Sequence, residues 1–147
     1  MTVTVRDLPP MTSLRSDWRT PRKLFAQLNE EFGFVLDAAA SPDNALCDRF
    51  LTADDNALWQ EWGSGPVWLN PPYGPPLEAF VRKAATEASK GATVVCLLPS
   101  MTGTKWWHEV VLVDATEIRF LRGRLRFDDG PMCAPFASVV VVFGGSR

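Results

Sequence analysis

Hydrophobic residues recur along this chain in two patterns, one with the spacing of a helix and one continuous. Apolar side chains at intervals of three and four residues predict helices within Leu24–Phe32, Leu77–Ala88 and Trp106–Val111. Short runs rich in apolar and β-branched residues predict buried strands, namely Phe34–Leu36, Val67–Leu69, Ala92–Leu98, Ile118–Leu121 and Ala137–Phe143. Between the first two strands, Phe50–Leu51 is compatible with a further short strand and Asp55–Trp62 with a short helix.

The ends of the predicted helices carry recognisable signals. Thr20 is typical of an N-cap residue, Pro21 of a first helical position, and Gly33 and Gly91 of helix ends. Because strands and helices alternate, the sequence predicts an α/β fold with a mostly parallel sheet. The last two strands follow one another without a helix between them, so we expect them to pair antiparallel.

Three residues share a position directly after a predicted strand. Asp37, Asn70 and Pro99 stand at the carboxyl ends of the first three runs. Open α/β sheets bind ligands at these ends of their strands, so the positions point to a binding site. The alternative is that polar residues and prolines simply terminate strands, which is sufficient for Pro99 taken alone.

Composition limits the classes of protein that fit. A chain of 147 residues is the size of one domain, and we expect a flexible arm over residues 1–17 and a single folded domain over residues 18–147. The net charge of −2 excludes a global basic field. Three scattered cysteines and one histidine argue against zinc and against a disulfide framework, which fits a cytoplasmic protein. The apolar runs are too short to span a membrane.

The segment from Asn70 to Tyr73 carries the most specific chemistry. Two prolines fix the backbone, which holds the Pro71 carbonyl oxygen in one direction, and Asn70 offers an amide oxygen beside it. Two acceptors suit an amino group, and Tyr73 could stack on a flat base. The exocyclic nitrogen of adenine is a poor nucleophile, and accepting both its hydrogens would favour attack. The alternative is a rigid turn or an exposed polyproline segment.

From about Trp18 to Phe143 the chain resembles the phage-type DNA N6-adenine methyltransferases, which are related to Dam-type enzymes. The resemblance rests on six segments, namely residues 18–21, 34–40, 70–74, 98–99, 119–125 and 135–136. It implies a minimal Rossmann-like fold, S-adenosylmethionine as methyl donor, S-adenosylhomocysteine as product, and no metal. It implies catalytic roles for Asn70, Pro71, Pro72 and Tyr73. The residues implied in cofactor binding are Trp18, Thr20, Pro21, Asp37, Ala38, Asn70 and an acidic residue such as Asp54 or Asp55.

The expected partner is DNA, met by a local cluster of cations. This cluster consists of Arg119, Arg122, Arg124 and Arg126, helped by Arg15, Arg19, Arg22 and Lys23 near the start of the chain. A solvated strand and hairpin would explain the same arginines. Related enzymes carry a separate target-recognition domain, which we do not expect here, so specificity would come from loops or from a second subunit in a homodimer. Methylation of an RNA base or of a protein glutamine, and an inactive homologue that only binds, remain as alternatives.

Overall fold

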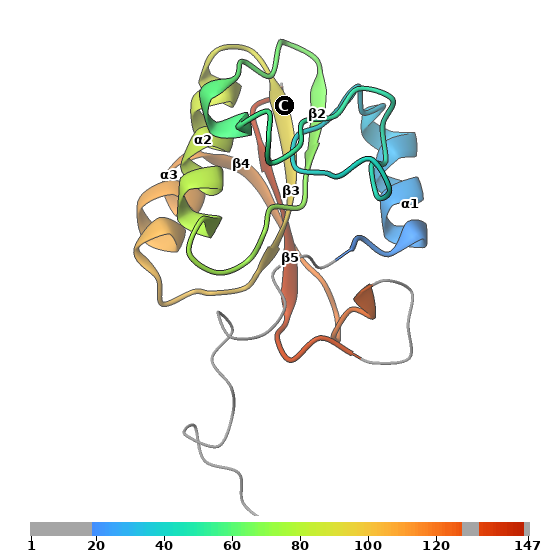
Figure 1. Cartoon of the computed structure of the whole chain (residues 1–147). Helices are drawn as coiled ribbons and strands as arrows, with labels where there is room; N and C mark the ends of the chain where they lie inside the picture. Colours follow the sequence, from blue (N-terminus) through green and yellow to red (C-terminus); the bar gives the residue numbers. More distant parts are fainter. Residues whose placement is uncertain (1–18, 128–132, 146–147) are drawn as a thin grey trace, which may run out of the picture.

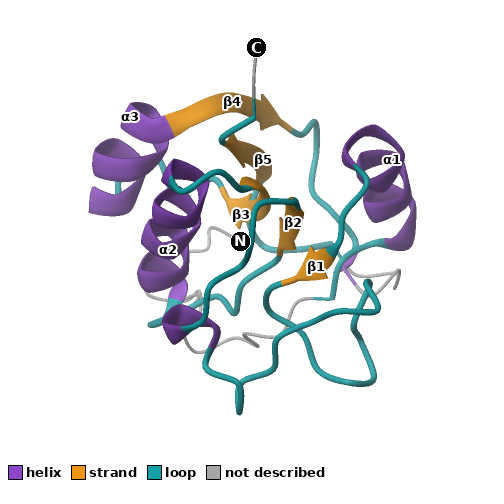
Figure 2. Cartoon of the chain, turned by 90° about the horizontal axis from the view of Figure 1, so that it is seen from above, coloured by secondary structure: helices purple, strands orange, loops and turns teal. Residues whose placement is uncertain are grey.

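The computed structural model of the chain describes residues 19–127 and 133–145. One five-stranded sheet forms the centre, with α1 on one side and α2 and α3 on the other (Figures 1 and 2). The strands are β1 (Leu36–Asp37), β2 (Pro66–Leu69), β3 (Thr93–Pro99), β4 (Ala115–Phe120) and β5 (Ser138–Phe143). The helices are α1 (Arg22–Phe32), η3 (Ala57–Trp59), α2 (Leu77–Ser89), η4 (Trp107–Val111) and α3 (Leu112–Asp114).

The sheet has the order β1-β2-β3-β5-β4. β1, β2 and β3 pair in parallel, whereas β5 is antiparallel to both of its neighbours, β3 and β4. The antiparallel pairing of the last two strands is therefore confirmed. The prediction of a mostly parallel sheet holds only in part, because two of the four described pairings are antiparallel. β5 enters between β3 and β4, so the last strand in sequence is not the edge of the sheet.

The start of α1 differs from the prediction. Pro21 occupies the N-cap position with an extended backbone, and no side chain caps the helix. Thr20 is therefore not the N-cap, and its hydroxyl instead accepts a hydrogen bond from Asn70. The end of the helix agrees with the prediction, since Gly33 takes the left-handed conformation at φ 68° and its N–H bonds the carbonyl oxygen of Asn29.

The long connection between β1 and β2 contains little regular structure. Phe50 forms a single parallel bridge to Asp37 in place of a strand, and the predicted helix is reduced to the one 3₁₀ turn of η3. The third predicted helix is also irregular, because five residues of π-helix in η4 precede α3. These departures arise where the apolar pattern is shortest.

The core lies on both faces of β3 and β5. Every residue of β5 is buried, as are six of the seven in β3. Phe25 of α1 packs edge-on against Trp68 of β2, with ring centroids 5.5 Å apart, so α1 is fixed to one face of the sheet. Trp106 and Trp107 are both buried, which places them in the core. No helix within the described residues is long and apolar enough to cross a membrane.

Candidate active site

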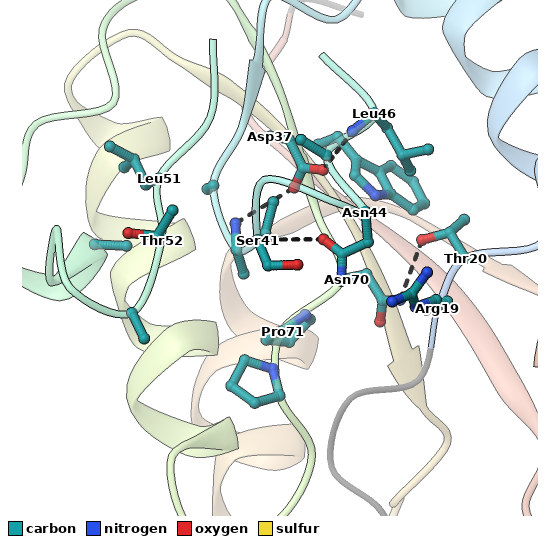
Figure 3. A pocket seen from close by; sticks show the side chains of 18 of the residues that line it. Arg19, Thr20, Asp37, Ser41, Asn44, Leu46, Leu51, Thr52, Asn70 and Pro71 are labelled. Carbon is teal, nitrogen blue, oxygen red and sulfur yellow. Dashed lines mark hydrogen bonds between the residues drawn. The ribbon is translucent and has the colours of Figure 1, made fainter. Parts of the chain in front are cut away.

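A cleft of about 1060 Å³ opens where β1 and β2 end (Figure 3). Most of its lining comes from three segments, which lie within residues 19–22 before and at the start of α1, residues 37–46 at and after the end of β1, and residues 51–58 around η3. Asn70, Pro71 and Pro72 lie at the end of β2, and Phe80 of α2 also lines the cleft. Its volume is that of a site for a nucleotide-sized ligand. The position agrees with the expectation that strand ends carry the site.

Asp37 is a buried carboxylate in the wall of this cleft, with 3% of its surface exposed. Burial raises the pKa of Asp37 from 3.8 to about 6, against the lowering effect of two backbone hydrogen bonds. These bonds come from the N–H of Leu46 at 3.1 Å and of Ala39 at 3.4 Å. A positively charged ligand in the cleft would stabilise the ionised form of this buried acid.

The segment after β1 is held by its own side chains. The N–H of Ser41 donates to Oδ1 of Asn44 at 2.7 Å, and the hydroxyl of Ser41 donates to Asp43 at 2.6 Å. Arg19 reaches across the rim of the cleft and pairs with Asp43 at 2.9 Å. Asp43 and Asn44 thus form a turn, and Asp43 also ties this turn to the residues that precede α1.

Asn70 and the two prolines stand together at the end of β2. Pro71 is buried and Pro72 half-buried, and both line the cleft. Nδ2 of Asn70 donates to the hydroxyl of Thr20 at 3.1 Å, which orients the amide (Figure 3). The structure thus brings Thr20, Asp37, Ala38, Asn70, Pro71 and Pro72 into one cleft.

Tyr73 does not lie with them. Its ring is 1% exposed and packs edge-on against Phe127 and Phe136, at centroid distances of 6.3 Å and 5.5 Å. Its hydroxyl donates to the carbonyl oxygen of Leu97 at 3.0 Å. The structure therefore presents no stacking face at Tyr73, and this ring instead fastens the end of β2 to β3.

The remaining predicted cofactor residues are more scattered. Asp54 and Asp55 are exposed and do not line the cleft, and Asp55 instead accepts hydrogen bonds from the N–H and hydroxyl of Thr52. Pro21 adjoins the cleft without lining it. Trp18 lies outside the described residues.

The predicted basic cluster divides into two groups. Arg119 of β4 pairs with both carboxylate oxygens of Glu31, pairs with Glu117, and lies over the ring of Phe32. These contacts fasten β4 to α1 and give Arg119 a role in packing, while its contact with DNA stays a prediction. The second group follows β4 and is exposed to solvent: Arg122, Arg124 and Arg126.

Sequence reasoning missed several residues of the site. Arg19, Ser41, Asn44, Thr52 and Phe80 line the cleft, although no motif singled them out as its lining. The clustering of small polar residues after Asp37 was the available signal, because such residues often bond their own backbone. Within the described residues, no group of three or more histidine, cysteine, aspartate and glutamate side chains could hold a metal ion.

A family model and two related proteins that match this chain share one description. The family model described as "DNA N-6-adenine-methyltransferase (Dam)" matches residues 10–138. A DNA N-6-adenine-methyltransferase of Escherichia phage T1 is 37% identical over 118 residues, which is 79% of this chain and 49% of the relative. A protein of the same name from Haemophilus phage HP1 is 31% identical over 106 residues, or 71% of this chain and 61% of the relative. The matched part of the chain thus spans about half the length of the first relative and about three fifths of the second.

Proposed function

Because the chain belongs to the DNA N-6-adenine-methyltransferase (Dam) family, we propose that it transfers a methyl group from S-adenosylmethionine to the N6 amino group of adenine in DNA. The observation that carries this proposal is the meeting of two different chemistries in one cleft. A buried carboxylate, Asp37, and a positioned amide, Asn70, both line it. The first suits a cationic methyl donor and the second an amino group that must become a nucleophile.

The cleft fits S-adenosylmethionine by the chemistry of its lining. Asp37 would face the positive charge of the cofactor, which restores to that carboxylate the stabilisation lost by burial. Ala38, Ala39 and Ala40 leave room for the ligand beside the backbone, since each side chain is a single methyl group. The apolar side chains of Leu51, Leu58 and Phe80 also line the cleft and would cover a flat adenine ring.

Catalysis would depend on acceptors at the end of β2. The oxygen of the Asn70 amide and the carbonyl oxygen of Pro71 would accept the two hydrogens of the adenine amino group, which localises the lone pair on nitrogen. When bound, S-adenosylmethionine supplies a methyl group on a positive sulfur. The adenine nitrogen held by Asn70 and Pro71 would form the new N–C bond to this methyl group as the C–S electron pair returned to sulfur, which would leave S-adenosylhomocysteine as the product. The methylated nitrogen then loses one proton to water, since an amide is too weak a base to keep it.

DNA would approach the open side of this cleft. The exposed group Arg122, Arg124 and Arg126 is the proposed phosphate contact, because these guanidinium groups meet solvent whereas Arg119 is paired. Base stacking is not assigned to Tyr73 in this proposal, because its ring is buried. A homodimer remains a prediction, and sedimentation at several protein concentrations would test it.

Transfer of a labelled methyl group tests the proposal. The protein is incubated with methyl-labelled S-adenosylmethionine and, in separate reactions, with duplex DNA, structured RNA and a peptide containing glutamine. Label in DNA alone supports the proposal. Label in RNA or in the peptide would show that the substrate is not DNA, although the protein still transfers a methyl group. Absence of label in all three, with S-adenosylmethionine still bound in calorimetry, would indicate a homologue that only binds.

A further inference from the structure

The catalytic amide is oriented by a residue far away in the sequence. Thr20, which precedes α1, lies 50 positions before Asn70, and its hydroxyl oxygen is 3.1 Å from Nδ2 of that residue. Both side chains are partly buried and line the cleft. In Figure 3 the Asn70 amide turns its nitrogen toward Thr20 and its oxygen away from it.

The orientation of this amide matters because its two ends have opposite character. An asparagine side chain carries an acceptor oxygen and a donor NH₂ group, and a rotation by half a turn exchanges them. The proposed reaction needs the acceptor toward the adenine amino group. The rotated amide would present two hydrogens to two hydrogens, which repels the substrate. We propose that Thr20 is a positioning residue, which binds the nitrogen of the Asn70 amide and so keeps its oxygen directed at the amino group.

Thr20 is itself held from both sides. The residue before it, Arg19, pairs with Asp43 on the opposite rim at 2.9 Å. The residues after it lead into α1, where Phe25 packs against Trp68, two positions before Asn70 on β2. The hydroxyl is therefore placed relative to the end of β2 by contacts that do not involve the amide. This inference rests on the proposed function for its consequence, but the hydrogen bond itself can be measured without any methyl transfer.

Isosteric variants of Thr20 test the role. Thr20→Val keeps the shape and removes the hydroxyl, and Thr20→Ser keeps the hydroxyl. We expect Thr20→Val to lower the single-turnover rate on DNA about tenfold at saturating S-adenosylmethionine, the loss typical of one hydrogen bond. Thr20→Ser should restore most of that rate. The matched control is Thr86→Val. Thr86 is exposed on α2, and its hydroxyl donates to the carbonyl oxygen of Arg82, so this variant should leave the rate unchanged.

A second background separates positioning from general structural support. In an Asn70→Asp variant the side chain ends in two equivalent oxygens, so its rotation no longer changes what the substrate meets. Adding Thr20→Val to Asn70→Asp should therefore change the remaining rate by less than about twofold. An equal tenfold loss in both backgrounds would overturn the inference, as would a Thr20→Val defect that lies in S-adenosylmethionine affinity with the single-turnover rate intact.

The measurement that does not depend on activity uses the Asn70 side-chain amide in an NMR spectrum of ¹⁵N-labelled protein. One of its two hydrogens should exchange slowly with water in the wild type and in Thr20→Ser, and faster in Thr20→Val. Equal exchange in all three overturns the inference, even if the protein methylates DNA. A changed exchange in a protein that transfers no methyl group supports the contact and would instead remove the proposed function.

Discussion

The two halves of the sheet differ in what holds them. β3 and β5 pair over six residues and are almost wholly buried, whereas β1 and β2 pair over only two. In the first half, apolar burial and a regular ladder supply the stability. In the second half, long segments leave the strand ends, and side chains such as Asp37 bind the backbone in place of a ladder. The irregular half lines the candidate site, and its polar side chains both bond the backbone of the loop and face the cleft.

The largest expected effect is a loss of turnover from a change in the candidate site that leaves the fold intact. Asn70→Ala removes an acceptor that matters most as the amino group attacks, so turnover on DNA should fall roughly a hundredfold to a thousandfold. Affinity for S-adenosylmethionine, measured by calorimetry, should change far less, and the free energy of unfolding should change little. A variant that turned over at near the wild-type rate would remove Asn70 from the catalytic centre.

The next largest effect is a loss of stability in the half of the sheet that contains β3 and β5. Leu97 of β3 is fully buried, and Leu97→Ala should lower the free energy of unfolding by about 2–5 kcal/mol. Val35, beside β1, is 49% exposed, and Val35→Ala should change it by only about 0.5 kcal/mol. Urea unfolding monitored by tryptophan fluorescence compares the two. Similar losses in both variants would contradict the division of the sheet.

Protonation of Asp37, at the end of β1, should make the stability of the fold depend on pH. Because the folded-state pKa is raised from 3.8 to about 6, the folded protein holds a proton that the unfolded chain has released between these values. The contribution of Asp37 is therefore favourable below about pH 4 and is lost as the pH rises toward 6, by roughly 3 kcal/mol at most.

Unfolding by urea at several pH values measures this dependence. In the wild type, the N–H of Ala39 donates to Oδ1 of Asp37 and the N–H of Leu46 to Oδ2, so the Asp37→Asn variant keeps an acceptor for only one of these bonds. The variant side chain cannot ionise, so its stability should vary less with pH over the same interval. An equal dependence of stability on pH between 4 and 6 in the wild type and in Asp37→Asn would contradict this role of Asp37.

The smallest effects concern the arginines. Replacement of Arg122, Arg124 and Arg126 by alanine should flatten the salt dependence of DNA binding, by up to about 0.9 in the logarithmic slope for each lost phosphate contact. Arg119→Ala should leave that slope unchanged and cost roughly 1 kcal/mol or less of stability, because its ion pairs are partly exposed. DNA titrations at several salt concentrations distinguish the two groups. A slope that changes only with Arg119→Ala would exchange their roles.

The sequence predicted the regular half well for a physical reason. Continuous apolar runs mark buried strands, and both β3 and β5 are such runs. Asn70 was also predicted, because a polar residue after a buried strand has a defined place at the edge of the sheet. The segment between β1 and β2 could not be predicted in detail, since single bonds such as that of Asn44 to Ser41 leave no periodic pattern.

Long-range partners account for side-chain contacts that the sequence did not predict. Arg119 meets Glu31 across 88 positions, and no local pattern announces such a pair. The sequence also gave no sign that the ring of Tyr73 turns inward to Leu97 O. The Thr20 hydroxyl suits an N-cap by its local context, yet it bonds Asn70 once the chain has folded. In each case the residue type indicated what kind of contact the side chain could make, but the sequence did not predict which residue it would contact.

The most direct test of the account is the identity of the methylated product. DNA is incubated with the protein and S-adenosylmethionine carrying a deuterated methyl group, and the nucleosides from the digested DNA are separated and analysed by mass spectrometry. We predict that the deuterated methyl group appears on the N6 nitrogen of deoxyadenosine, and that Asn70→Ala reduces this signal roughly a hundredfold or more. Label on any other nucleoside, or equal label with Asn70→Ala, would contradict the account.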